Sequence, residues 1–153
     1  MRKRIISTAD GGPRSADWLD LESLATVELS SEDPAHPFEA ALADGGVGWR
    51  AGSPGAQTVR VVFDAPQRIG RVRLCFEEAE RSRTQEFALL WSADGREFRE
   101  LVRQQWTFHP PTGSRELEVY EVALDGVKAL ELRIRPDLGD GSAVASLAEL
   151  RVG

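Results

Sequence analysis

The chain has 153 residues, of which 41% are hydrophobic and 29% are charged, and its formal net charge at pH 7 is -6. A chain of this length is expected to form one domain with a substantial hydrophobic core. The negative charge argues against nucleic acid as a partner, because binding to nucleic acid depends mainly on basic contacts to phosphate. The single cysteine, Cys75, excludes an intrachain disulfide. The sequence shows neither a signal peptide nor an apolar run long enough to span a membrane, so we expect a cytoplasmic protein.

The chain is predicted to divide into an N-terminal tail with an anchoring turn, over residues 1–23, and one β-sandwich domain, over residues 24–153. The beginning of the tail is polar and without periodicity, as is typical of a terminus or a peripheral strand. Trp18, Leu19 and Leu21 follow, and we expect them to form a turn that packs on the core.

From residue 24 onward, short segments alternate between apolar and polar residues, which is the period of a half-buried β-strand. Turn residues separate these segments, and no long helical period lies between them. The pattern predicts an all-β, antiparallel sandwich or jelly roll. The predicted strands are 24–30, 58–63, 69–76, 85–92, 97–103, 117–124, 129–135 and 144–152.

Two long irregular stretches, 31–57 and 104–115, stand out between the predicted strands. The first is predicted to contain a short helical turn, because Pro37 suits a first helical position and Gly45 can close a helix. Asp44 lies beside the last carbonyls of that turn, which have no backbone partner. Carbonyl and carboxylate oxygens are the ligands that calcium uses, so this turn is a candidate calcium site.

The second stretch begins with the unusual segment Gln104–Pro111, which carries two large aromatic residues, two amides and a histidine. Aromatic rings beside amide and imidazole groups suit a flat ligand with hydroxyl groups, such as a sugar ring. The alternative is that Trp106 and Phe108 continue a strand and fill the core. Trp49 and Arg50 also leave two interpretations open, since Arg50 can contact a ligand or can pair with a carboxylate while Trp49 covers the end of the sandwich.

No catalytic arrangement is visible in the sequence. There is no Gly-x-Ser-x-Gly motif, and His36 and His109 lack the spacing of metal ligands. Cys75 is expected to be an inert thiol that points outward. The acidic run Glu77–Glu80 could line a site, but such a run is more often a solvated loop. We therefore predict a binding module and not an enzyme.

Several short motifs follow one another along the chain: Ala43-Asp44-Gly45, Trp49, Thr58–Phe63, Ser92-Ala93-Asp94-Gly95 and Leu147–Val152. Their order and spacing resemble the discoidin or coagulation factor 5/8 type C family of galactose-binding-like domains. The resemblance covers roughly residues 24–153. It implies an eight-stranded antiparallel jelly roll with short helical turns, whose loops at one end bind ligands. Many members of that family are sugar-binding modules, and others bind lipid or protein surfaces.

The resemblance also implies a structural calcium ion beside the first loop. In the family, backbone oxygens, the Asp of the Ala-Asp-Gly turn and a Glu in the final strand bind this ion. The matching positions in this chain are Ala41, Asp44 and Glu149.

A narrower likeness concerns Ser30-Ser31-Glu32-Asp33, His36, Glu39 and Trp49-Arg50-Ala51. These residues are similar to the N-terminal domain of the eukaryotic single-strand-break repair scaffold, which has the same fold. This likeness supports the fold and an intracellular variant of it.

The function predicted from the sequence is carbohydrate binding through loops at one end of the sandwich. The alternative is an intracellular protein–protein interaction domain that uses the same end. Four strand crossings separate Trp49 from Trp106, so both are expected at one rim. The predicted ligand-binding residues are Arg50, Gln105, Trp106, Phe108, His109 and His36.

Overall fold

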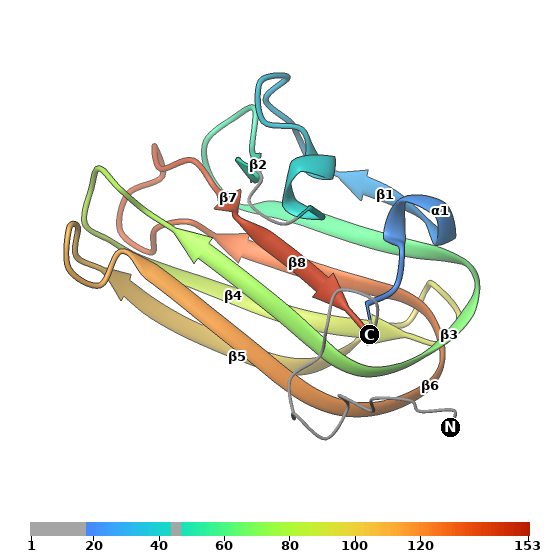
Figure 1. The fold of residues 1–153 in the computed structure, drawn as a ribbon. Coiled ribbons are helices and arrows are strands. Elements are labelled where there is room, and N and C mark those ends of the chain that lie inside the picture. The colour runs from blue at the N-terminus through green and yellow to red at the C-terminus, as the bar shows by residue number, and fades with distance from the viewer. Residues whose placement is uncertain (1–17, 44–46) are drawn as a thin grey trace, which may run out of the picture.

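A computed structural model describes residues 18–43 and 47–153 of the chain. The described residues form strands almost throughout, with two short helices before the second strand (Figure 1). The elements are α1 (Leu21–Leu24), β1 (Ala25–Leu29), the 3-10 helix η3 (Phe38–Ala41), β2 (Trp49–Arg50), β3 (Gln57–Glu77), β4 (Arg83–Ser92), β5 (Arg99–Phe108), β6 (Arg115–Arg135), β7 (Ser146–Leu147) and β8 (Glu149–Val152).

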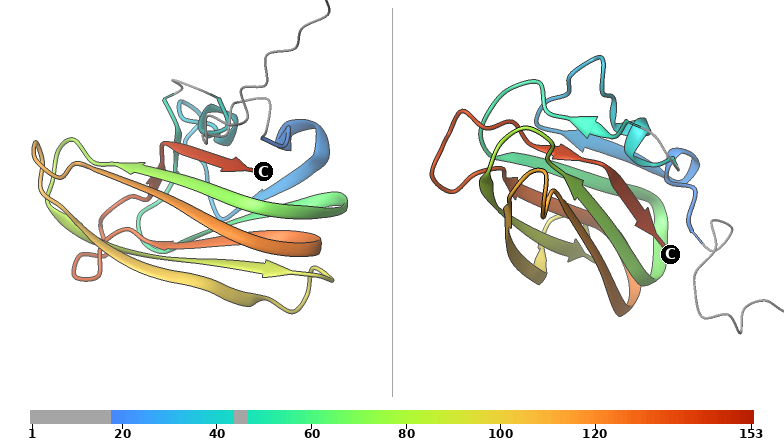
Figure 2. Two further views of the ribbon diagram at one scale, coloured as in Figure 1. Left: turned by 60° about the horizontal axis from the view of Figure 1, so that its bottom comes forward. Right: turned by 60° about the vertical axis from the view of Figure 1, so that its left-hand side comes forward.

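The strands build an antiparallel sandwich of two layers (Figure 2). One layer has the order β1-β3-β6-β4-β5, and β8 pairs with the second half of β3 in the other layer. The all-β sandwich predicted from the alternating pattern is confirmed. None of the helices in the described part of the chain is both long and apolar enough to cross a membrane.

The predicted strand boundaries need one correction, because β3 and β6 each continue through both layers. Predicted strands 58–63 and 69–76 are the two halves of β3, and strands 117–124 and 129–135 are the two halves of β6. The register between β3 and β6 shifts between Val62 and Arg71, which marks the bend between the layers. Pairing continues through this bend, so the polar residues there did not end the strands as the sequence pattern suggested.

The core lies between the inner faces of the two layers. The predicted inward residues of β3, such as Phe63 and Phe76, are fully buried. Phe76 stacks against Phe87 of β4, with ring centroids 5.0 Å apart. Cys75 alternates to the outer face as predicted, but it is covered, and Nε of Arg115 donates a hydrogen bond to its sulfur at 3.2 Å.

Strand β5 is longer than predicted and runs to Phe108. The expected irregular stretch 104–115 is therefore reduced to the turn after Phe108, where His109 and Thr112 form an isolated bridge. Phe108 has no exposed surface and packs under the guanidinium of Arg83, 4.6 Å from the ring centroid. Its side chain is part of the core, which corrects its prediction as a ligand-binding residue.

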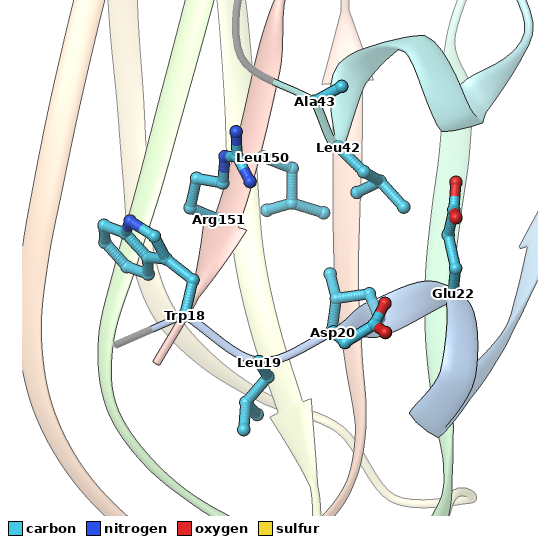
Figure 3. Close-up of a pocket in the computed structure, with 9 residues that line it drawn as sticks. Trp18, Leu19, Asp20, Glu22, Leu42, Ala43, Leu150 and Arg151 are labelled. Carbon is cyan, nitrogen blue, oxygen red and sulfur yellow. The ribbon is translucent and has the colours of Figure 1, made fainter. Parts of the chain in front are cut away.

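The last predicted strand, 144–152, is divided in two. Ala148 donates its backbone N–H to Cys75 instead of continuing the pairing with β2, so β7 and β8 belong to different sheets. Strand β8 also holds the start of the described chain, because the N–H of Leu19 donates to the carbonyl of Val152 at 2.7 Å. Trp18 lies beside Arg151 of β8 (Figure 3), and Leu21 is buried.

Candidate functional site

One end of the sandwich is the end where β2 pairs with β7 (Figure 1). A recess lies between the loops at this end. The first residues of β3 and β4 and the last residues of β5 lie at this end as well. Gln57 of β3, Phe87 of β4 and Gln104 of β5 are in register with one another across the sheet. We call the hollow, of about 410 Å³, the rim recess. It is lined by His36, Val47, Trp49, Arg50, Glu77, Glu78, Ala79, Glu80, Arg81, Ser142, Val144, Ser146, Leu147 and Ala148.

Trp49 forms the fixed wall of the rim recess. It is 1% exposed, its Nε1 donates to the carbonyl of Ser31 at 3.3 Å, and its ring packs against Phe38. Gly48 precedes it with a φ of +79°, and a Cβ at that position would lie 2.6 Å from the Leu147 carbonyl oxygen. The close approach of these two segments therefore requires glycine before the tryptophan. This supports the interpretation in which Trp49 covers the end of the sandwich.

Arg50 and His36 lie together on one side of the rim recess. The backbone N–H of Arg50 donates to the carbonyl of His36, and the carbonyl of Arg50 accepts from the N–H of Asp33. The Asp33 carboxylate accepts the Ala35 N–H at 3.0 Å and lies 3.4 Å from Nδ1 of His36. These two partners, and to a smaller extent the charge of Arg50, lower the pKa of Asp33 below its usual value. Backbone bonds thus position the segment, and the Arg50 side chain, which is exposed, is left without an ion pair among the described residues.

The β3–β4 loop forms the opposite side of the rim recess. Glu78 accepts from Nε of Arg83 at 2.6 Å and from the backbone N–H of Glu80. Partial burial works against ionisation of Glu78, but these hydrogen bonds and the charge of Arg83 lower its pKa overall. Arg81 forms an ion pair with Asp140. Within the described chain the Glu80 carboxylate has no ion pair, so Arg50 and Glu80 are the charged side chains that the recess leaves available.

The predicted ligand-binding residues do not all gather in this recess. Arg50 and His36 line it, whereas Gln105 lies on the outer face of β5 and donates to Glu86 at 3.0 Å. His109 is exposed in the turn after β5. Trp106 belongs to β5 and is 36% exposed, on the same face as its partner Gln85, which points into the sandwich. The aromatic residues that we expected in a loop are therefore part of strand β5. The count of strand crossings concerned the end of the sandwich at which Trp106 lies and not the direction of its side chain.

Trp106 lies at the open edge between the layers, beside a group of buried polar residues. Alternate residues of β4, β5 and β6 face one another there, since Arg83 lies opposite Phe108 and Phe87 contacts Tyr120. Among the described residues, the buried polar atoms of this edge without a well-aligned hydrogen bond are Nε2 of Gln85, both carboxylate oxygens of Glu116 and the hydroxyl of Tyr120. The carboxyl group of Glu118 lies close to Glu116 and to Tyr120.

Glu116 dominates the electrostatics of this open edge. Its side chain is 1% exposed, and the carboxyl group of Glu118 lies next to it on the same face of β6. Burial and this second carboxyl raise the pKa of Glu116 to about 8, although the charge of Arg83 acts in the other direction. Burial and the same Glu118 also raise the pKa of Tyr120. Both effects favour the protonated form of Glu116.

The predicted calcium ligands are only partly described by the structure. Asp44 lies outside the described residues. Ala41 ends η3 and is fully buried, and Glu149 lies in β8, where its carboxylate is 3.2 Å from Arg73 and 3.6 Å from Arg151. Among residues 18–43 and 47–153 no three acidic, histidine or cysteine side chains form a metal-binding group. Two arginines neutralise Glu149, and Asp44 is not among the described residues, so calcium binding at this position stays a prediction.

Comparison with known proteins defines the class of the chain. The family model of the F5/8 type C domain matches residues 26–150. The chain therefore belongs to the F5/8 type C domain family, as the sequence motifs indicated. No curated protein matches the chain.

Three of the solved structures that share this fold are carbohydrate-binding modules. A pectin-binding carbohydrate-binding module is 20% identical with a TM-score of 0.60, over 85% of this chain and 90% of that chain. The family 32 module of AlyQ, in complex with 4,5-unsaturated mannuronic acid, is 18% identical with a TM-score of 0.60, over 85% and 95%. A family 32 module from Clostridium perfringens, in complex with GalNAc-beta-1,3-galactose, is 20% identical with a TM-score of 0.59, over 84% and 94%. At these identities the likeness establishes the fold.

Several residues of the rim recess had no distinctive sequence pattern. The run Glu77–Glu80 was interpreted mainly as a solvated loop, yet it forms one side of the recess. Ser142 and Ser146 come from the segment between β6 and β8, where single serines carry no spacing that identifies a site. The pairing of β2 with β7, two segments far apart in the sequence, places Ser146 opposite Arg50.

Proposed function

We propose that this domain is a non-catalytic carbohydrate-binding module and that the rim recess holds the sugar. The observation that carries the proposal is the pair Arg50 and Glu80, two charged side chains without ion pairs among the described residues that line one recess. A guanidinium donates hydrogen bonds and a carboxylate accepts them, so together they match neighbouring sugar hydroxyls, which do both. The serines and His36 add further polar groups around the same volume.

The family and the structural neighbours support this proposal. The neighbours named above bind pectin, an unsaturated mannuronic acid and a galactose-containing disaccharide. Uronic acids and galactosides are therefore the first sugars to test. An acidic sugar would pair its carboxylate with Arg50, and a neutral galactoside would use Arg50 and Glu80 together.

The test is isothermal titration with galactose, N-acetylgalactosamine and oligogalacturonate, followed by a glycan array. Arg50→Ala is expected to weaken sugar binding at least about tenfold, equivalent to about 1.4 kcal/mol. Arg96→Ala is the matched control, because Arg96 is exposed, has no ion pair in the described chain and lies in the turn between β4 and β5 at the other end of the sandwich. Binding that survives Arg50→Ala unchanged would contradict the assignment of the recess.

The alternative function is a protein-interaction domain that uses the same end. It predicts no response on the glycan array and capture of a protein that is lost in Arg50→Ala but kept in Arg96→Ala. The same pair of variants therefore separates the two functions.

A further inference from the structure

Arg83, the first residue of β4, lies outside the set of residues that line the rim recess. It is 4% exposed, so its guanidinium is withdrawn from solvent. The ring of Phe108 packs against this guanidinium, with the ring centroid 4.6 Å from its central carbon. Burying a charged group is costly unless its donors are hydrogen-bonded. The partners of the Arg83 donors therefore indicate what the side chain does.

The guanidinium of Arg83 donates to two segments that meet at the rim recess. Its Nε donates to Oε1 of Glu78 in the β3–β4 loop at 2.6 Å. Its Nη1 donates to the backbone carbonyl of Pro136 at 2.7 Å, at the start of the segment between β6 and β7. The same Nη1 donates to Oε1 of Gln85 at 3.1 Å, which keeps the guanidinium oriented. A planar guanidinium can bond several acceptors at once in a fixed geometry, which a lysine ammonium does less well.

Glu78 transmits this constraint to the acidic side of the recess. Its Oε1 accepts from Arg83, while its Oε2 accepts the backbone N–H of Glu80 at 3.0 Å and lies 3.4 Å from the backbone nitrogen of Arg81. One carboxylate thus folds the turn that carries the Glu80 side chain. Burial works against ionisation of Glu78, and the hydrogen bond and charge of Arg83 counteract this, so the pKa of Glu78 is lowered overall.

The segment between β6 and β7 is tied to the same loop and carries Ser142 into the recess. Arg81 of the β3–β4 loop forms an ion pair with Asp140. Oδ1 of Asp140 accepts the backbone N–H of Ser142 at 2.8 Å and its hydroxyl at 2.7 Å. The carbonyl of Thr84 in β4 also accepts the N–H of Leu138 in this segment at 2.9 Å. One network that begins at the start of β4 thus holds the acidic side of the recess and its serine.

We propose that Arg83 is a positioning residue for sugar binding, because it holds the β3–β4 loop and the segment between β6 and β7 in the arrangement of the rim recess without touching the sugar. This role depends on the function proposed for the recess. Two segments that are fixed before the ligand arrives lose little conformational freedom on binding, which favours affinity. Removing Arg83 is therefore expected to leave the sandwich folded and to weaken the binding of sugar.

The first test is isothermal titration of Arg83→Gln at pH 7 with galactose, N-acetylgalactosamine and oligogalacturonate. The affinity for the sugar that the wild type binds is expected to fall at least about tenfold. Arg60→Gln is the matched control, because Arg60 also holds a carboxylate, that of the buried Glu131 at 2.6 Å, and does not line the recess. Urea unfolding identifies a temperature at which all variants are folded. Equal losses in both variants would show an effect of stability alone and would overturn the proposal.

Arg83→Lys is the conservative variant. It keeps the positive charge but replaces the guanidinium by a single ammonium, so its affinity should lie between those of the wild type and Arg83→Gln. If Arg83→Gln does not fold, Arg83→Lys takes its place and is compared with Arg60→Lys. The affinity of Arg83→Lys should then still fall about threefold or more below that of the control, and an affinity equal to that of the control would overturn the proposal.

The charges around Glu78 provide a readout that a purely structural role would not change. Arg83 faces Glu78 from β4, and Arg81 faces it from its own loop. The other charged groups that interact with these two arginines are Glu116 of β6 and Asp137 and Asp140 of the segment between β6 and β7. Without Arg83, burial still works against ionisation of Glu78, so its pKa should rise. As the pH falls, the variant then loses the carboxylate that folds the turn at a higher pH than the wild type does.

The affinity of each variant relative to the wild type is measured at pH 7 and at pH 5, because this ratio cancels the titration of other groups in the recess, such as His36. For Arg83→Gln the ratio should fall by a further factor of about three or more at pH 5, whereas for Arg60→Gln it should stay constant. Arg83→Lys retains a charge beside Glu78 and should keep the profile of the wild type. A ratio for Arg83→Gln that does not change with pH would overturn the positioning of the loop through Glu78.

Amide hydrogen exchange tests the positioning without a sugar. The N–H groups of Glu80 and Ser142 donate to carboxylates in the wild type and should exchange faster in Arg83→Gln, whereas the N–H groups of β3 and β6 should keep their protection. Unchanged exchange at both residues would overturn the proposal. A wild type that binds no sugar would refute the proposed function, and this role of Arg83 with it, whereas equal binding by the wild type and Arg83→Gln would refute the role of Arg83 alone.

Discussion

Replacing Glu116 by Gln is expected to remove a proton linkage from the stability of the domain. Glu116 is 1% exposed, its carboxyl group lies beside that of Glu118, and its pKa is raised from 4.5 to about 8 by burial and by Glu118. The folded state thus binds this proton more tightly than the unfolded state. The stabilisation is fully present below about pH 4.5 and is lost as the pH rises through about 8.

The magnitude follows from the size of the pKa difference. Each pKa unit corresponds to about 1.4 kcal/mol, so within this pH window the free energy of unfolding should fall by about 1.4 kcal/mol per pH unit because of Glu116 alone. Between pH 5 and pH 7 the loss is about 2 to 3 kcal/mol, because ionisation is incomplete near each end of this range, and this is a large part of the stability of a typical domain. Glutamine keeps the shape of the side chain but cannot ionise, so it cannot show this loss.

The assay is urea unfolding of the wild type and Glu116→Gln at several pH values between 5 and 8. The quantity to compare is the difference in unfolding free energy between the two proteins, and it should change with pH by the slope given above in favour of the variant at higher pH. Glu121→Gln is the matched control, because Glu121 lies on the exposed face of the same strand and pairs with Arg71. A difference between wild type and Glu116→Gln that stays constant from pH 5 to 8 would refute the assignment of a protonated, buried Glu116.

Two further predictions concern residues that the sequence placed at the ligand site or the metal site. Phe108→Ala should lower the free energy of unfolding by about 3 to 5 kcal/mol, whereas Trp106→Ala should lower it clearly less, because Phe108 is fully buried and Trp106 is 36% exposed. Urea unfolding measures both, and an equal or larger loss for Trp106→Ala would contradict the edge position. For calcium, the melting temperature should rise with calcium, fall with chelator, and lose this dependence in Asp44→Ala, since an ion bound at a hundredfold excess over its dissociation constant stabilises by about 2.7 kcal/mol. A wild type that melts identically with calcium and with chelator has no ion at this position.

The fold was largely predictable from the sequence because its strands alternate cleanly. The inner residues of β3, from Val59 to Phe63 and again near Phe76, follow the period of two that one buried face requires. The bend between the layers was not predictable in this way. At residues 64–68 the alternation is interrupted by polar residues, which is also how a loop looks, and only the partner strand β6 keeps the segment extended.

The candidate site was predicted only in part, for a related physical reason. Arg50 and His36 could be named because they lie in the irregular stretch 31–57, which follows a predicted strand. The orientation of Trp106 and Phe108 depends on where β5 ends, and the aromatic residues fit a strand and a loop equally well in the sequence. Glu80 and Ser142 join Arg50 only through the folding of separate segments onto one end, and a single sequence contains no record of that contact.

The chain is rich in arginine, and the ion pairs that most of the outer-face arginines form explain why Arg50 is assigned to a partner. On the outer faces most arginines bind glutamates across or along the strands: Arg60 and Arg133 hold the buried carboxylate of Glu131, and Arg103 holds Glu86 and Glu100. Such arginines stabilise the sheets, and their charge is not available to a partner. Arg50 differs because backbone bonds position its segment, so its guanidinium is not needed for the fold. A charge that the fold leaves without an ion pair beside a concave surface is therefore the one that we assign to a partner, which at the rim recess is a sugar.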